Sequence, residues 1–368
     1  MRCQIKKILH VSEALGTGVL NLISQLASAQ AADGFEVILL YSIRPETPSE
    51  DQLAILFPPP IVMINVPMVA QVSPLRDFIS VIALMKIIWK LRPDVIHLHS
   101  SKAGILGRVA ACLIGYRQRV FYSPHGLSFL KQDVSVVKRQ IYLWFERIAV
   151  YLGGVFVASA GTEADLARQS VMHKRVVLVE NSIELKSICT IDGVLRERVR
   201  VVTSGRICYP KAPWRFRDLA AQLSNESAEF VWIGDGELRH ELLVKEQLPN
   251  NLTISGWRGR DEVFGELSNA DIFVLLSLWE GMPLSLIEAQ ASGLPAVVSD
   301  VVGCKDVVRH GETGFVCGSM DEVVEKVRLL IRDCNLRMEM GKRAREMAMV
   351  RFSTERMHQE MLAVYGLG

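Results

Sequence analysis

The chain has 368 residues, enough for about two domains of ordinary size. Its side chains are 49% hydrophobic and 22% charged, which excludes a disordered or low-complexity protein. The formal net charge is only +2, and we expect no nucleic-acid partner. The mean hydropathy of +0.22 is high for a soluble enzyme. No run, however, approaches the roughly 20 apolar residues that span a bilayer.

The two halves of the chain differ in charge. Residues 1–180 hold 19 basic and 13 acidic side chains, whereas residues 181–368 hold 23 and 27. A basic first half suits an anionic ligand or surface, and ordinary scatter of surface charge is the alternative. The seven cysteines form no Cys-x-x-Cys pair, which favours reduced thiols in a cytoplasm. The first eleven residues lack the features of a signal peptide.

Short apolar runs alternate with longer amphipathic stretches. In the first half we predict strands at 5–12, 35–42, 61–66, 94–99, 119–123, 154–158 and 176–180, with helices at 19–32, 74–91, 102–114 and 135–151. Strands that are apolar throughout are buried on both faces, which indicates a parallel sheet covered by helices. Residues 181–198 break the alternation, and we interpret them as an inter-domain connection.

A second series follows this connection. We predict strands at 199–204, 230–233, 252–255, 272–276 and 296–299, with helices at 212–223, 237–246, 261–268, 284–292, 321–332 and 336–350. The pattern indicates two doubly wound α/β domains, 1–180 and 199–350, and a helix in 351–368 that packs back on the first domain. Ligands of such sheets bind at the carboxyl ends of the strands, so the loops after the strands are the candidate sites.

Two of these loops carry features of an anion site. Gly16 and Gly18 lie between a strand and a helix, where glycine lets the backbone approach a ligand. A dinucleotide fingerprint would require a further glycine at the position of Asn21, which disfavours a nicotinamide cofactor. Arg206 and Lys211 follow the first strand of the second domain. Two cations there can bind a diphosphate, and ordinary surface charge is the alternative.

The strongest signal is the segment 279–289. Gly281 permits close backbone approach, and Pro283 suits the first position of a helix whose amides can face a phosphate. Glu280 precedes this helix and Glu288 follows about two turns later. The two carboxylates can therefore accept hydrogen bonds from ligand hydroxyls at separate points. A solvated helix end is the alternative, but both carboxylates lie among apolar residues.

The order and spacing of these motifs resemble the retaining glycosyltransferases of family 4, which have the GT-B fold. Glu280 and Glu288 match the family's E-x7-E motif, and Gly205-Arg206 with Lys211 match its basic pair. The segments 234–236 (Gly-Asp-Gly) and 124–126 (Pro-His-Gly) are also similar. The resemblance implies an α/β protein with two Rossmann-like domains facing a central cleft. It also implies transfer of a sugar from a nucleotide sugar, a UDP-sugar being favoured.

The resemblance further implies a role for each matching residue. Arg206 and Lys211 would bind the donor diphosphate and stabilise the leaving group. Glu288 would hold the ribose, Glu280 a hydroxyl of the transferred sugar, and His125 would face that sugar. The other donor contacts would come from loops around the nucleotide, at Gly16, Gly18, Gly205, Trp257, Arg258, Gly281, Met282, Pro283 and Leu284.

The expected chemistry is front-face attack by an acceptor hydroxyl, assisted by the leaving phosphate. No residue stands out as the nucleophile that a retaining glycosidase needs. No Asp-x-Asp signature is present, so we expect neither an essential metal nor a cofactor. His97 and His99 alternate on a predicted strand, and we interpret them as buried or loop histidines rather than a metal pair. The loop 301–304 departs from the family pattern and leaves the sugar open.

The segment 127–150 mixes Lys131, Lys138, Arg139 and Arg147 with several aromatic residues. It is either a buried core helix or an amphipathic element that contacts an anionic membrane surface. The second interpretation would bring the enzyme to a polyprenyl-diphosphate-linked glycan, at the inner face of a bacterial plasma membrane, in surface-polysaccharide biosynthesis. A sugar-nucleotide epimerase of the same fold and a non-catalytic partner in a polysaccharide assembly complex are the alternatives.

Overall fold

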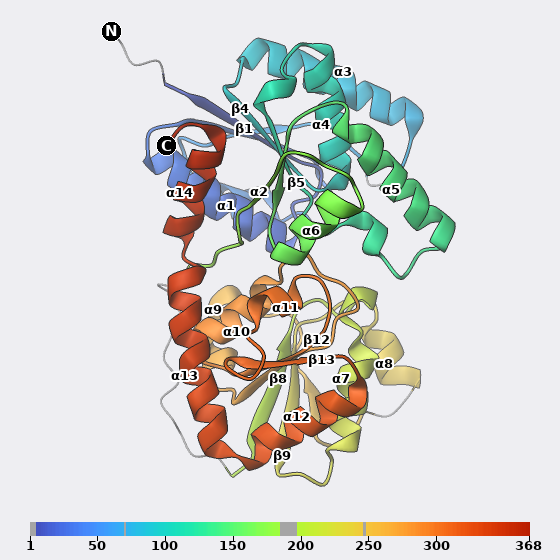
Figure 1. Ribbon diagram of the computed structural model, residues 1–368, viewed down its shortest axis with the longest axis vertical. Coiled ribbons are helices and arrows are strands. Elements are labelled where there is room, and N and C mark those ends of the chain that lie inside the picture. Colours follow the sequence, from blue (N-terminus) through green and yellow to red (C-terminus); the bar gives the residue numbers. More distant parts are fainter. Residues whose placement is uncertain (1–4, 70, 185–196, 246–247) are drawn as a thin grey trace. The chain divides into compact units, whose positions relative to one another are not determined.

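The computed structural model describes residues 5–69, 71–184, 197–245 and 248–368 (Figure 1). The chain forms two compact units, one of Met1–Asn181 with Thr354–Gly368 and one of Ser182–Ser353. The predicted connection at 181–198 falls largely on residues 185–196, outside the described part of the chain. Each unit is a parallel sheet with helices on both faces, so the predicted fold class is confirmed.

The first unit contains a seven-stranded parallel sheet in the order β3-β2-β1-β4-β5-β6-β7. Because β1 lies inside the sheet and the chain winds outward on both sides of it, this is a doubly wound sheet. All seven strands were predicted from their apolar runs: β1 Lys7–Ser12, β2 Glu36–Tyr41, β3 Val62–Asn65, β4 Val95–His99, β5 Val120–Ser123, β6 Val155–Ala158 and β7 Val176–Leu178.

Two apolar layers cover the faces of this sheet. On one face lie α1 (Thr17–Ala32), α2 (Glu50–Leu56) and the C-terminal α14 (Thr354–Tyr365). On the other lie α3 (Pro74–Leu91), α4 (Ser101–Leu113), α5 (Val136–Val150) and α6 (Gly161–Gln169). Figure 1 shows α14, in red, packed beside α1, in blue, although the two helices stand at opposite ends of the sequence.

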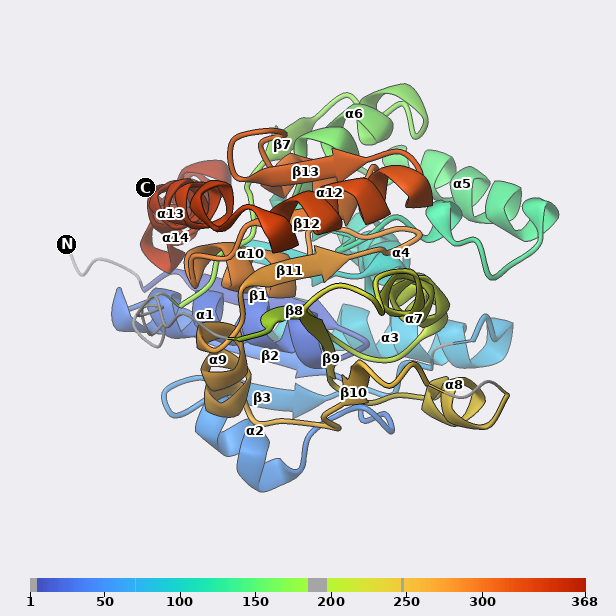
Figure 2. The ribbon, with the colours of Figure 1, turned by 90° about the horizontal axis from the view of Figure 1, so that it is seen from below.

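The second unit contains a six-stranded parallel sheet in the order β10-β9-β8-β11-β12-β13. Its strands are β8 Val199–Ser204, β9 Ala228–Ile233, β10 Leu252–Ile254, β11 Ile272–Leu275, β12 Ala296–Ser299 and β13 Gly314–Cys317. Its helices are α7 Pro213–Gln222, α8 Arg239–Lys245, α9 Arg260–Ser268, α10 Leu284–Ala291, α11 Cys304–Val307, α12 Met320–Arg332 and α13 Cys334–Arg351. Figure 2 shows α9, α10 and α13 on one face of this sheet and α7 and α8 on the other.

Several short elements escaped prediction. No strand is predicted at 314–317, yet β13 pairs there with β12 at the sheet edge. Helix α2 begins at a capping box between Ser49 and Gln52, a signal that the sequence contains. Helix α6 contains only three apolar residues, Ala164, Leu166 and Ala167, so its apolar signal is short. Among the described residues, no helix is long and apolar enough to cross a bilayer.

Candidate active site

Lys211 and Glu280 form an ion pair at the carboxyl ends of β8 and β11. Lys211 Nζ lies 2.7 Å from Glu280 Oε1, and both side chains are less than one-fifth exposed. The hydroxyl of Ser277 donates a second hydrogen bond to the same carboxylate oxygen at 2.7 Å. Burial acts to lower the pKa of Lys211, but the Glu280 carboxylate outweighs it and holds that pKa above its ordinary value. The site therefore contains a fixed and fully charged ammonium.

The predicted Gly-Asp-Gly turn supports the loop that carries this lysine. The amide of Ile207 donates to the carbonyl of Asp235 at 2.8 Å. A Cβ at Gly234 would lie 2.3 Å from the carbonyl oxygen of Gly205, and one at Gly236 would lie 2.4 Å from that of Ile207. Two backbone segments approach here so closely that only glycine fits. The turn therefore acts by packing against the basic loop.

Arg206 differs from Lys211 in its surroundings, although the sequence pairs them. Its side chain is 52% exposed and lies 3.5 Å from Glu237, which is equally exposed. A surface pair of this kind contributes little to stability. Arg206 is thus a solvent-exposed cation, whereas Lys211 is largely buried and tightly paired.

Glu288 lies on α10, about two turns after Glu280. Pro283 is the N-cap of this helix and precedes its first residue, so the prediction that proline occupies the first helical position was wrong by one residue. No hydrogen bond to the Glu288 carboxylate is present within the described part of the chain. Burial raises the pKa of Glu288 to about 7, opposed only by the charge of Arg260. An acceptor in this state suits ligand hydroxyls.

The loop before α11 packs directly on the segment before α10. Gly303 has a φ of +82°, and a Cβ there would lie 1.7 Å from the carbonyl oxygen of Gly281. The side chain of Met282 is buried. Cys304 is also buried, which raises the pKa of its thiol well above the ordinary value and keeps it protonated. The thiol is therefore no nucleophile for the reaction.

Trp257 and Arg258 follow β10. Trp257 is 58% exposed, and Arg258 makes a partly exposed ion pair with Glu262 at 3.5 Å. Sequence reasoning selected these two residues but missed Arg260, whose charge reaches Glu288. No motif marks Arg260, because its relation to α10 depends on how α9 packs.

Gly16 and Gly18 stand at the start of α1 in the first unit. Gly16 is the N-cap of the helix, and Gly18 is its exposed second residue. Sequence analysis missed the buried Glu13 in the same loop, which accepts hydrogen bonds from the Ser100 hydroxyl and, at 3.3 Å, from the Ala103 amide. Burial raises the pKa of Glu13, against the effect of a nearby arginine. This carboxylate joins the first glycine loop to the start of α4.

His125 occupies a strained loop after β5. Its φ of +54° lies in the left-handed region, which is uncommon for a residue with a side chain. The amide of Gly126 donates to Glu163 Oε1 at 3.2 Å, and Ser159 donates to Glu163 Oε2 from its amide at 2.8 Å and its hydroxyl at 2.9 Å. Glu163, a buried carboxylate on α6, therefore holds the Pro-His-Gly loop in place. Sequence analysis did not select it.

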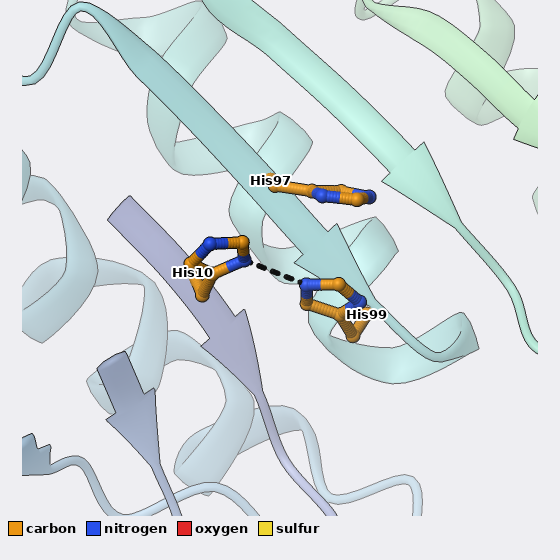
Figure 3. Close-up of side chains that lie close together, drawn as sticks. All are labelled: His10, His97 and His99. Carbon is orange, nitrogen blue, oxygen red and sulfur yellow. Dashed lines mark hydrogen bonds between the residues drawn. The ribbon is translucent and has the colours of Figure 1, made fainter. Parts of the chain in front are cut away.

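Three histidines lie together beneath this loop (Figure 3). His97 and His99 are buried on β4, in agreement with their interpretation as buried histidines. His10 joins them because β1 pairs with β4 in the register that sets His10 beside His97. One ring nitrogen from each lies within 4.8 Å of the others. Sequence analysis missed His10, since nothing in the sequence states which strands are neighbours.

Comparisons with known proteins identify the family. Residues 16–187 match the family described as "Glycosyltransferase Family 4", and residues 194–347 match "Glycosyl transferases group 1". A protein of Escherichia coli named "UDP-Gal:alpha-D-GlcNAc-diphosphoundecaprenol alpha-1,3-galactosyltransferase" is 30% identical over 281 residues, which cover 71% of each chain. The chain belongs to glycosyltransferase family 4. It is therefore a glycosyltransferase.

Solved structures share the fold over nearly the whole chain. Sucrose-phosphate synthase from Thermosynechococcus elongatus has a TM-score of 0.82 at 19% identity, covering 98% of both chains. HepE from Anabaena, solved with UDP and glucose, has a TM-score of 0.77 at 18% identity and covers 98% of this chain and 99% of its own. At these identities the likeness shows the GT-B fold alone.

Proposed function

We propose that this glycosyltransferase transfers a sugar, with retention, from a UDP-sugar to a hydroxyl of a polyprenyl-diphosphate-linked glycan in the biosynthesis of a bacterial surface polysaccharide. The acceptor class is supported by the Escherichia coli relative, whose name specifies a diphosphoundecaprenol substrate. The pathway is supported by a 23% identical relative from Staphylococcus aureus named "Capsular polysaccharide biosynthesis glycosyltransferase CapM", which covers 82% of this chain and 83% of its own.

The ion pair of Lys211 with Glu280 is the observation that carries the donor half of the proposal. In the reaction the bond between the anomeric carbon and the diphosphate oxygen breaks, and negative charge builds up on the diphosphate. A preorganised ammonium at the carboxyl end of β8 stabilises that charge without reorganisation, and Arg206 adds a second cation. The acceptor oxygen bonds to the same face of the anomeric carbon, and its proton passes to the leaving phosphate. No divalent ion takes part.

The decisive experiment incubates the protein with a panel of UDP-sugars and a synthetic GlcNAc-diphosphate lipid. We expect UDP release and a lengthened lipid-linked glycan only when donor and acceptor are both present. The anomeric configuration of the product, read by NMR, tests retention. Turnover of the donor without acceptor would indicate the epimerase alternative. Failure of every nucleotide sugar to bind would favour the non-catalytic alternative.

The second part of the proposal concerns an anionic membrane surface, which helix α5 contacts. Only Glu146 and Ala149 of the fifteen residues of α5 are buried, while Tyr142, Leu143 and Val150 pack in part against the core. Its outer side exposes large apolar side chains beside basic ones: Val136, Val137, Ile141, Trp144, Ile148 and the neighbouring Tyr151 are 42–85% exposed. Apolar and cationic side chains on one helix are typical of binding at an anionic lipid interface.

A buried ion pair joins α5 to α4, and Tyr142, Leu143 and Val150 of α5 pack against the core. Arg108 of α4 lies 3.0 Å from Glu146 Oε2, and the Tyr122 hydroxyl donates to Glu146 Oε1 at 2.7 Å. The inward side of α5 is therefore fixed while its outer side stays exposed.

Flotation with vesicles of phosphatidylglycerol and phosphatidylethanolamine tests the membrane contact. We expect binding that weakens with salt and is lost when Lys131, Lys138 and Arg139 are replaced by Glu. The matched control reverses three cations of α13, at Lys342, Arg343 and Arg351, and should leave flotation unchanged. Equal flotation of both triple variants would contradict the proposal.

A further inference from the structure

A chain of hydrogen bonds runs from α1 to His125 through the core of the first unit. Gln30 Oε1 lies 2.8 Å from His10 Nε2. His10 Nδ1 lies 3.0 Å from His99 Nε2, the link drawn in Figure 3. His99 Nδ1 lies 2.9 Å from His125 Nε2. Gln30, His10 and His99 are each at most 1% exposed. This series of hydrogen bonds therefore reaches the Pro-His-Gly loop entirely through the interior of the domain.

If the rings are neutral, all hydrogen bonds of this series must run in the same donor-to-acceptor direction. A neutral imidazole has one N–H and one lone pair, so it donates on one side and accepts on the other. Burial lowers the pKa of His10 and His125 to about 4, and that of His99 well below its ordinary value. All three rings are therefore neutral at pH 7. Only two arrangements satisfy every link: all protons on Nε2, or all on Nδ1.

The amide at the inner end selects between the two arrangements. Gln30 presents its carbonyl oxygen to His10, and an oxygen can only accept. His10 must then carry its proton on Nε2, which obliges His99 and in turn His125 to do the same. The Gln30 amide also acts on the Tyr365 hydroxyl, where a hydrogen bond from Gln30 lowers the pKa of Tyr365 against the larger effect of burial. The Gln30 oxygen is thus the group that fixes the direction.

We propose that Gln30, His10 and His99 are positioning residues that hold His125 in one tautomer, with its proton on Nε2 and a lone pair on Nδ1. No hydrogen bond to His125 Nδ1 occurs within the described part of the chain, so this atom is available as an acceptor. The inference rests on the proposed function together with the role that the family resemblance implies for His125, which would face the transferred sugar. A neutral acceptor suits the positive charge that develops at the anomeric carbon, whereas an imidazolium would oppose it.

A metal ion is a poorer explanation of the same cluster. His97 already uses both ring nitrogens, accepting or donating to the Ser123 hydroxyl at 2.9 Å and the Tyr365 hydroxyl at 2.7 Å. Its ring lies over that of His99, with centroids 4.1 Å apart and planes tilted by 39°. Three ligands of a tetrahedral ion must instead point their lone pairs at one centre. Because the rings overlap and both nitrogens of His97 are already hydrogen-bonded, the cluster is better explained by hydrogen bonds than by metal coordination.

The first test reads the tautomers in the wild-type protein without substrate. NMR of the wild-type protein labelled with ¹⁵N-histidine reads which nitrogen of each ring carries the proton, and a His125→Asn spectrum assigns the His125 signals. We expect Nε2–H in all three rings. Protonation of His125 on Nδ1 would overturn the proposal. So would one equivalent of zinc per chain, found by elemental analysis and lost in His10→Phe.

The second test perturbs the remote end of the chain. Gln30→Met removes the accepting oxygen but leaves His125 untouched. We expect a mixture of His125 tautomers and kcat lowered about tenfold, the effect of one misdirected hydrogen bond, with unchanged UDP affinity. The control is Gln25→Met on the same helix, whose partner is Thr354 at 3.2 Å. It should alter neither tautomer nor kcat.

The outcomes separate this proposal from the proposed function. A single Nε2–H tautomer in a protein that turns over no nucleotide sugar would refute the function and retain the positioning chain. Normal turnover by Gln30→Met, with His125 still wholly protonated on Nε2, would refute the positioning chain and retain the function. If Gln30→Met does not fold, the wild-type tautomer still decides.

Discussion

Glu288 on α10 allows a quantitative prediction, because its burial has opposite effects on stability and on ligand binding. Its pKa rises from 4.5 to about 7 in the folded protein, chiefly through burial, with the charge of Arg260 acting against the rise. The native state therefore holds this proton more tightly than the unfolded chain does. Stability from this group is lost as the pH rises from about 4.5 through 7, and the loss is complete above that range.

The size of the effect follows from the pKa difference. Each unit of difference in pKa corresponds to about 1.4 kcal/mol of free energy. Ionisation of the Glu288 carboxyl therefore lowers the free energy of unfolding of the second domain by up to about 3 kcal/mol. Glu288→Gln keeps the shape of the side chain and removes the charge. We expect the variant to be more stable than the wild type at pH 8, by up to about 3 kcal/mol, and equally stable at pH 4. Urea unfolding at both pH values measures this.

Ligand binding should show the reverse pattern. If the carboxylate accepts hydrogen bonds from the ribose hydroxyls, UDP affinity rises with pH up to about 7, and binding below that pH releases a proton. Glu288→Gln should lose this pH dependence and bind UDP about 10- to 100-fold more weakly, as expected for losing hydrogen bonds to a charged group. Calorimetric titration in buffers of different ionisation enthalpy detects the proton.

The matched control is Glu346→Gln, which neutralises an exposed carboxylate on α13. It should change neither the pH dependence of stability nor UDP affinity. Two results would refute the reasoning. One is a Glu288→Gln variant that is no more stable than the wild type at pH 8. The other is UDP affinity that stays pH-dependent in that variant.

Four further predictions follow from the described contacts. Lys211→Ala should lower kcat by about 10² to 10³, the usual loss when one preorganised charge-stabilising group is removed. Arg206→Ala removes an exposed cation and should lower kcat less, and steady-state kinetics of the two variants measures the difference. Gly303→Ala should weaken UDP binding at least about tenfold, since its Cβ collides with Gly281 and must displace the segment before α10; unchanged affinity by calorimetry would contradict this. Glu146→Ala should destabilise the first unit by about 3–5 kcal/mol, because it leaves the buried Arg108 without its partner carboxylate. Replacing both Arg108 and Glu146 by Met should restore much of the lost stability, as measured by urea unfolding. Treatment with EDTA should leave turnover intact, and loss of activity that Mg²⁺ restores would overturn the metal-independent mechanism.

Much of the architecture could be predicted from local sequence. Apolar runs marked twelve of the strands because buried parallel strands need apolar side chains on both faces. The amphipathic stretches marked most of the longer helices for the same reason. Prediction failed where the local signal was short, as at β13, or where few apolar residues formed a stripe, as in α6.

The site was predictable only in part. The E-x7-E spacing and the basic loop selected Lys211, Glu280 and Glu288, because a glycine-rich loop followed by a helix is a local pattern. The sequence assigned Lys211 to the diphosphate and Glu280 to a sugar hydroxyl, and gave no indication that the two form an ion pair at 2.7 Å. That pairing depends on β8 lying beside β11, a non-local contact.

Chain length, the strand–helix alternation, the family motifs and the basic first half are properties of the sequence by itself. The tertiary structure decided which of those residues meet. His10, His97 and His99 become one cluster only when β1 pairs with β4, and Gln30 and Tyr365 complete its hydrogen bonds only when α1 and α14 cover that face. The exposure of α5 was decided in the same way, since a buried face and a membrane-binding face need the same apolar residues. Only packing distinguishes the two.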